Sequence, residues 1–238
     1  MNLTKSVTLS TLILASAGVA NAFPIYTGSI SYSADISATP LWDKSTTSLS
    51  WVVKDTGLTQ GGNVIWNYEY TWSTADKNLS HIIIELSNTS VVISNLKVNG
   101  ATGSTSNYEI KTYTVGGNGD SNVGLPGDII GIKLDDKADL TTTTFSFDTV
   151  NSPVWGDFYA KDGTSKVGNG NDAITYDTYA YNTTFLAADP TDAPSNGSIN
   201  HHVLRPDTVT TRVPDGGSTI FLFSSALVGL GLIRRRIH

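Results

Sequence analysis

The chain has 238 residues, no cysteine and a formal net charge of −6, and only 15% of its residues are charged. This length suits a single all-β domain of ordinary size. The missing cysteines exclude disulfides, thiolate nucleophiles and cysteine-based metal sites, and the acidic balance argues against a nucleic-acid partner, because phosphate binding needs a basic face.

Residues 1–22 have the pattern of a secretory signal peptide. Lys5 supplies a positive start, and the apolar stretch that follows is short for a membrane span. Ala20 and Ala22 are the small residues of a cleavage site, so we expect the mature chain to begin at Phe23. The alternative is an uncleaved N-terminal anchor.

Residues 23–186 have the composition of a body built from short strands. Runs of β-branched and aromatic residues alternate with clusters of Gly, Asn, Asp and Ser, which is the signature of strands and turns. We predict an all-β fold, an antiparallel two-sheet sandwich of jelly-roll or immunoglobulin-like type, with no amphipathic helix. The predicted strands cover 48–54, 64–73, 81–86, 91–98, 108–115, 129–134, 142–147, 154–160 and 174–181.

One predicted strand, 64–73, carries an aromatic stripe on one face. A flat stripe of this kind can stack sugar rings, which makes it a candidate ligand platform. Its members alternate along the strand and are Trp66, Tyr68, Tyr70 and Trp72. The alternative is that the stripe packs between the sheets, where aromatic rings bury the most area. The polar residues on the opposite face favour this alternative.

The carboxylates of the body form no catalytic pair that spacing alone can identify. Glu69, Glu85 and Glu109 fall in three different predicted strands, and we interpret them as solvated side chains rather than as the two acids of a glycoside hydrolase. The loops at 118–122 and 169–172 offer oxygen ligands suited to calcium. Ordinary turn chemistry explains their Asn, Gly and Asp residues equally well.

The stretch 187–212 is rich in proline and polar residues, and we predict that it forms a flexible stalk. It contains His201 and His202, but no Ser-His-Asp arrangement or zinc motif can be assembled around them from spacing. We therefore expect a body that is not an enzyme and that uses no cofactor and no metal.

The C-terminal segment, 213–238, has three parts. It opens on a short motif, Val213, Pro214, Asp215, Gly216, Gly217, Ser218 and Thr219. The uncharged stretch 218–233 would form a helix about 24 Å long at about 1.5 Å per residue, slightly short of a bilayer core of about 30 Å. We predict that it is a single transmembrane helix. A membrane stop follows, which the positive-inside rule keeps cytoplasmic: Arg234, Arg235 and Arg236.

This three-part tail resembles the PEP-CTERM sorting signal, in the variant that reads Val-Pro-Asp-Gly-Gly-Ser-Thr. The resemblance implies an exported bacterial protein whose partner is an exosortase, a membrane enzyme that cuts near the motif. We expect the protein at the cell envelope or cell surface, anchored in the membrane by helix 218–233 before processing. The body then serves as a non-catalytic binding or structural module for extracellular polysaccharide or other matrix proteins. The alternative is a secreted glycan-acting hydrolase.

Overall fold

The computed structural model describes residues 23–116, 122–136, 138, 140–168 and 173–209. The predicted signal peptide 1–22 and the sorting tail 213–238, with its helix 218–233, lie outside the described residues. In the part of the chain that is described, no helix is long and apolar enough to cross a bilayer. Its regular elements are β-strands and one short 3-10 helix, η1 (Thr105–Asn107), so the prediction of an all-β body is confirmed.

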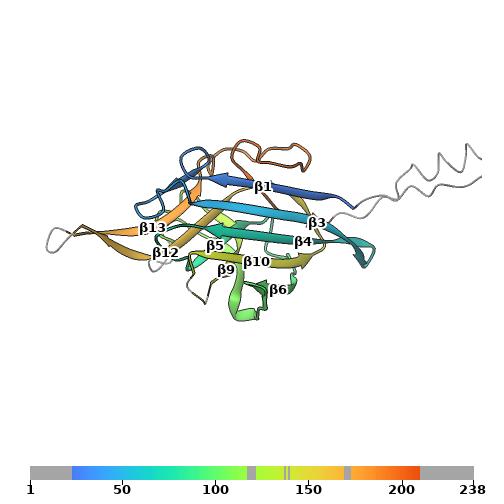
Figure 1. Ribbon diagram of the computed structural model, residues 1–238. Helices are drawn as coiled ribbons and strands as arrows, with labels where there is room; N and C mark the ends of the chain where they lie inside the picture. Colours follow the sequence, from blue (N-terminus) through green and yellow to red (C-terminus); the bar gives the residue numbers. More distant parts are fainter. Residues whose placement is uncertain (1–22, 117–121, 137, 139, 169–172, 210–238) are drawn as a thin grey trace, which may run out of the picture.

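Two large antiparallel sheets dominate the fold. The first has the strand order β1-β3-β4-β10-β6-β7. Figure 1 shows β1, β3, β4 and β10 side by side in one layer. The strands of this sheet, in chain order, are β1 (Ile25–Ser31), β3 (Ser48–Gln60), β4 (Asn63–Ser73), β6 (Ser94–Val98), β7 (Ala101–Thr102) and β10 (Thr142–Thr149).

The second sheet has the order β2-β13-β12-β5-β9-β8, and the β12–β13 hairpin extends beyond the other strands (Figure 1). Its strands are β2 (Ile36–Ala38), β5 (His81–Glu85), β8 (Tyr108–Tyr113), β9 (Ile129–Asp135), β12 (Phe158–Val167) and β13 (Ile174–Asn182). A third, two-stranded sheet pairs β11 (Asn151–Gly156) with β14 (Val203–Val209).

The two large sheets pack face to face through their apolar sides. In β3 the buried residues Leu49, Trp51 and Val53 alternate with more exposed neighbours, as the period of a strand requires. The rings of Trp72 in the first sheet and Phe158 in the second lie 6.1 Å apart, and both belong to one core cluster. The predicted two-sheet arrangement is therefore confirmed, while the choice between jelly-roll and immunoglobulin-like types stays a prediction.

The predicted strand 154–160 is in fact two strands. The chain leaves β11 at Gly156, passes Asp157, and enters β12 at Phe158. These strands belong to different sheets, because β11 pairs with β14 and β12 pairs with β5 and β13. The apolar pattern continues through the break, since Trp155 and Phe158 are both fully buried, and this continuity concealed the change of sheet.

The structure decides against the candidate ligand platform on β4 and for the packing alternative that the sequence favoured. Tyr68, Tyr70 and Trp72 are fully buried between the sheets, so the packing alternative holds for these three rings. Trp66 is only partly buried and stacks on Tyr26, with 6.2 Å between ring centroids. Rings inside the core offer no flat surface to a sugar, because their faces already contact other side chains.

The prediction of a flexible stalk over 187–212 is wrong for residues 203–209, which form β14. Val203 and Leu204 are fully buried, and the Tyr70 hydroxyl donates a hydrogen bond of 2.8 Å to the Leu204 carbonyl. Pro206 lies opposite Pro153 in the pairing register. Proline argues against a central strand, but a two-stranded sheet has only edge strands and tolerates it.

The hydroxyl of Tyr70 gives a test of this attachment. Tyr70→Phe keeps the buried ring but leaves the Leu204 carbonyl without its donor, so we expect a loss of about 1–3 kcal/mol in unfolding free energy. Denaturant unfolding of the full-length chain in mild detergent measures it. The matched control is Tyr176→Phe, the same chemical change at a half-buried tyrosine of β13. Equal midpoints for the two variants would contradict the attachment.

Candidate functional site

Of the site residues that the sequence predicts, only the aromatic stripe and Phe23 lie in the described part of the chain. Three rings of the aromatic stripe lie in the core, and Trp66 is partly buried at its edge. The signal-cleavage residues Ala20 and Ala22 lie outside the described residues, as do the sorting motif 213–219 and the arginines 234–236. Phe23, the predicted first residue of the mature chain, is 48% exposed.

A polar groove covers the outer face of the first sheet, on the side of β4 opposite the aromatic stripe. It has a volume of about 630 Å³. Glu69 from β4 and Lys97 from β6 are exposed in it, together with Lys54 from β3. The alternation of β4 produces this face directly, because every second residue must point away from the core.

Asp148 organises one end of this groove. Its two carboxylate oxygens accept hydrogen bonds of 2.7 Å from the side-chain amides of Asn67 and Asn95. Asn95 has a positive φ of 52° and lies where the register between β6 and β10 shifts. Asn tolerates this left-handed conformation better than most residues. The groove therefore presents a preorganised row of amide, carboxylate and ammonium groups, which can bind the hydroxyls of a polar polymer.

A second polar feature, which we call the buried charge cluster, lies where four segments of the chain meet. Glu85 ends β5, Asp157 separates β11 from β12, and Asp189 follows β13. His202 immediately precedes β14, and Arg205 lies within it. His202 is only 1% exposed, and Asp157 and Arg205 are each 6% exposed. Charges buried to this degree persist only when each has partners of opposite charge or hydrogen bonds.

Arg205 provides most of the positive charge in the cluster. Its Nη2 lies 2.8 Å from Oδ2 of Asp189, and its Nε lies 3.4 Å from Oε2 of Glu85. Its Nη1 also donates a hydrogen bond of 2.8 Å to Ser87 Oγ. Gly156 makes room for the guanidinium, because a Cβ at that position would lie 2.0 Å from Arg205 Nε. Arg205 thus joins β14 to the end of β5 and to the segment after β13.

Asp157 is buried, and its side chain and its backbone N–H each make a hydrogen bond. Its Oδ1 accepts a hydrogen bond of 2.6 Å from the Asn182 amide, and its backbone N–H donates to Glu85 Oε2 at 2.8 Å. Burial raises the pKa of Asp157 from 3.8 to about 8, and the negative charges of Glu85 and Asp189 add to this rise. Burial also raises the pKa of Glu85. Asp157 therefore keeps a proton at neutral pH in the absence of a bound cation.

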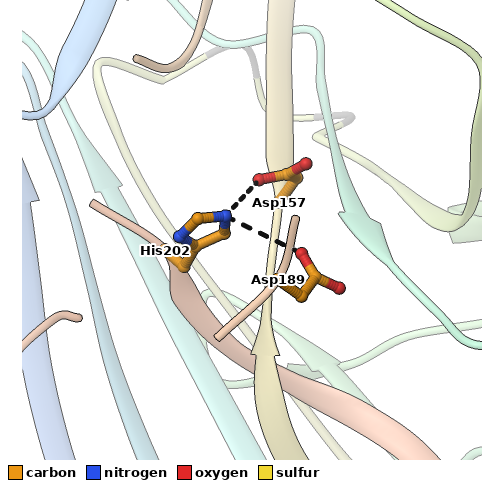
Figure 2. A group of neighbouring side chains, drawn as sticks. All are labelled: Asp157, Asp189 and His202. Atoms are coloured by element: carbon orange, nitrogen blue, oxygen red, sulfur yellow. Dashed lines mark ion pairs between the residues drawn. The ribbon is translucent and has the colours of Figure 1, made fainter. Parts of the chain in front are cut away.

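His202 points its Nε2 between two carboxylates, as Figure 2 shows. This atom lies 3.4 Å from Oδ1 of Asp157 and 3.7 Å from Oδ1 of Asp189. In the described part of the chain, Nε2 has no hydrogen-bond partner. The other ring nitrogen, Nδ1, lies 3.3 Å from the Ile199 carbonyl. Burial lowers the pKa of His202, so the ring is neutral near pH 7.

The carboxylate side of the cluster opens into a pocket of about 370 Å³. Glu85, Asp157 and Asp189 line it together with Asp128 and the apolar side chain of Leu186. The acids are therefore accessible to small ions or molecules from this pocket.

Sequence reasoning missed every member of the buried charge cluster. The sequence pattern suggests a solvated Glu85, and it places Asp189, His202 and Arg205 in a flexible stalk. One signal was present, because Arg205 stands next to the apolar residues Val203 and Leu204. An arginine beside a short apolar run suggests a buried ion pair, although it cannot name the partner.

Comparison with known protein families finds one match. The VPDSG-CTERM motif matches residues 212–237, a range that contains the predicted motif 213–219 and the three arginines. No curated protein and no solved structure matches the chain. The match supports a PEP-CTERM-like sorting tail, and it indicates an exported, envelope-associated protein.

The raised pKa of Asp157 predicts a pH dependence of stability. An acid whose folded pKa exceeds its unfolded pKa stabilises the fold fully below the unfolded value and loses this contribution as pH rises through the folded value. Stability should therefore fall between pH 4 and about 8 through this group. The slope should be smaller in Asp157→Asn, which cannot ionise. Unfolding of both full-length chains in metal-free buffer across this range measures the difference, and parallel profiles would contradict the assignment.

Proposed function

We propose that this protein is an exported envelope protein that an exosortase recognises and processes, and that its body is a non-catalytic binding module for extracellular polysaccharide. The observation that carries the proposal is the VPDSG-CTERM match over 212–237. The three-part order of motif, apolar stretch and arginines supports it. In this proposal the tail determines where the body is delivered, and the body determines what is bound there.

The physical case for the tail rests on two opposed preferences. The apolar stretch 218–233 is stable in a bilayer and unfavourable in water. Arg234, Arg235 and Arg236 resist transfer across the membrane, so they hold the stretch in place as a transient anchor. Pro and Gly residues such as Pro214 and Gly216 disfavour helix formation, and in this proposal a membrane-embedded enzyme recognises the motif that contains them.

The case for polysaccharide binding rests on the polar groove of the first sheet. The groove follows several neighbouring strands and is lined by hydrogen-bonding side chains, which suits an extended polymer better than a compact ligand. Lys54, Lys97 and Glu69 offer both donors and acceptors. The buried aromatic stripe below it keeps the strands of this face in place, so the polar groups are preorganised.

The alternative is a secreted glycan-acting hydrolase, and one observation favours it. Glu85 and Asp157 border the same pocket, and an acid that is protonated near neutral pH can serve as a general acid. The hydrogen bonds of these groups argue against it. Oε2 of Glu85 accepts from the Asp157 backbone, and Oδ1 of Asp157 accepts from Asn182. Each acid therefore already accepts a hydrogen bond that holds segments of the fold together.

Two changes in the tail should separate anchoring from processing. Replacing Arg234, Arg235 and Arg236 with Ser should weaken membrane retention, so that uncut protein leaks outward. Pro214→Ala with Asp215→Ala should preserve anchoring but block cleavage, so that a full-length membrane form accumulates. Immunoblots of cell fractions measure both.

The matched control for the motif is Asp192→Ala with Pro194→Ala, the same pair of changes upstream of the tail. It should be processed like the parent chain. If the arginine and motif variants were both processed and distributed like the parent, the tail would be a hydrophobic anchor alone, and the sorting proposal would fail.

Binding by the groove can be tested with a panel of bacterial extracellular polysaccharides. Glu69→Gln combined with Lys97→Ala should weaken binding by about tenfold or more, equivalent to about 1.4 kcal/mol. The control is Glu109→Gln with Lys111→Ala, an exposed ion pair of 2.9 Å on the second sheet. Titration calorimetry measures affinity, and a reducing-end assay run in parallel detects cleavage. Equal affinity of the two double variants would exclude the groove, and cleavage by the parent chain would favour the hydrolase.

A further inference from the structure

The buried charge cluster contains three potential metal ligands, and one of them, His202 Nε2, has no hydrogen-bond partner among the described residues. One carboxylate oxygen of Asp157, one of Asp189 and a ring nitrogen of His202 all lie within 4.8 Å of one another. They come from three separate segments of the chain. Figure 2 shows the imidazole directed toward both carboxylates.

The orientation of His202 identifies which ring nitrogen is free. Nδ1 lies 3.3 Å from the Ile199 carbonyl, which can only accept a hydrogen bond, so Nδ1 carries the proton of the neutral ring. Once Asp157 is ionised, Nε2 presents a lone pair to two carboxylates that also offer lone pairs. In the described part of the chain it has no hydrogen-bond partner, and the side chain is only 2% exposed. Three buried acceptors facing one another need a proton or a cation between them.

We propose that Asp157, Asp189 and His202 bind a divalent transition-metal cation of the zinc type. An imidazole ligand favours zinc and its transition-metal neighbours over magnesium and calcium, which prefer oxygen alone. Zinc takes imidazole nitrogen and carboxylate oxygen at about 2.0–2.2 Å, so ligand atoms in a tetrahedral site lie about 3.3 Å apart. The distances from Nε2 to the two carboxylates, 3.4 and 3.7 Å, are close to that value.

The surrounding hydrogen bonds are those of a supported metal site. Asn182 donates to the carboxylate of Asp157, and the Ile199 carbonyl fixes the ring of His202. Arg205 binds Oδ2 of Asp189 and leaves Oδ1 directed toward the imidazole. Partners of this kind orient metal ligands and fix the histidine tautomer.

The three ligands leave a fourth tetrahedral position free. Asp157 and Asp189 both line the pocket of about 370 Å³, so a cation can enter from that side and a water molecule can complete its coordination. This proposal replaces the sequence-based expectation that the body binds no metal.

A cation at this position would fasten the C-terminal part of the body to the sandwich. Asp157 lies at the crossing between sheets, whereas Asp189 and His202 belong to the segment that leads to β14 and onward to the tail. The cation binds the folded arrangement and has no preformed site in the unfolded chain, so it stabilises the fold by mass action. This consequence does not depend on what the groove binds.

The experiment uses the full-length chain in detergent, treated with EDTA and then freed of chelator, with Zn²⁺ as the probe. Titration calorimetry should show saturable binding with a stoichiometry of one, and Zn²⁺ should raise the thermal unfolding midpoint. His202→Asn keeps a polar group near Ile199 but removes Nε2, and it should weaken Zn²⁺ binding by more than about 100-fold. Asp189→Asn should weaken it as well.

The matched control is His201→Asn. His201 is a 41% exposed histidine that contacts Asp35, and Asn tolerates its positive φ of 65°. This variant should bind Zn²⁺ like the parent chain. X-ray absorption of the Zn²⁺-bound parent chain should show nitrogen and oxygen ligands at about 2.0–2.2 Å, a result that does not depend on any variant folding.

Three outcomes would overturn the proposal. The first is the absence of saturable Zn²⁺ binding by the parent chain, which would leave a shared proton between Asp157 and His202. The second is unchanged binding by a folded His202→Asn chain, which would place the ion elsewhere. The third is displacement of Zn²⁺ by an equal concentration of Ca²⁺, which would exclude a site selected by imidazole.

Discussion

Burial of the aromatic face of β4 is the constraint on which the rest of the structure depends. Tyr68 and Tyr70 are fully buried, yet each carries a hydroxyl that must find an acceptor. These acceptors are the backbone carbonyls of Asn151 and Leu204. The core of the first sheet therefore holds both strands of the third sheet, and the position of β14 follows from the packing of β4.

The position of β14 in turn determines the charge cluster. Val203 and Leu204 anchor the strand in the core, so His202 and Arg205 are carried into a buried region beside the acids. Isolated charges there would be strongly unfavourable, and even a paired arrangement does not by itself stabilise a fold. Arg205 contacts Glu85 and Asp189 together, so it links β14 to the end of β5 and to the segment after β13.

The two faces of the first sheet have separate roles. Its inner face supplies the aromatic core, and its outer face carries the polar groove, where Glu69 and Lys97 are accessible to a ligand. The buried charge cluster has a different role, because it connects the sandwich to the segment that precedes the sorting tail.

Local sequence patterns determined the parts of this protein that depend only on neighbouring residues. Alternation predicted strands such as β3, β4 and β10, and the contiguous tail 213–238 was identifiable because its motif, apolar stretch and arginines follow one another. Only the tertiary structure decided which carbonyls accept from Tyr68 and Tyr70, that Pro206 lies in a strand, and that His202 meets Asp157. Those outcomes depend on which strands pair and which faces meet, and strand order brings together residues that no local periodicity relates.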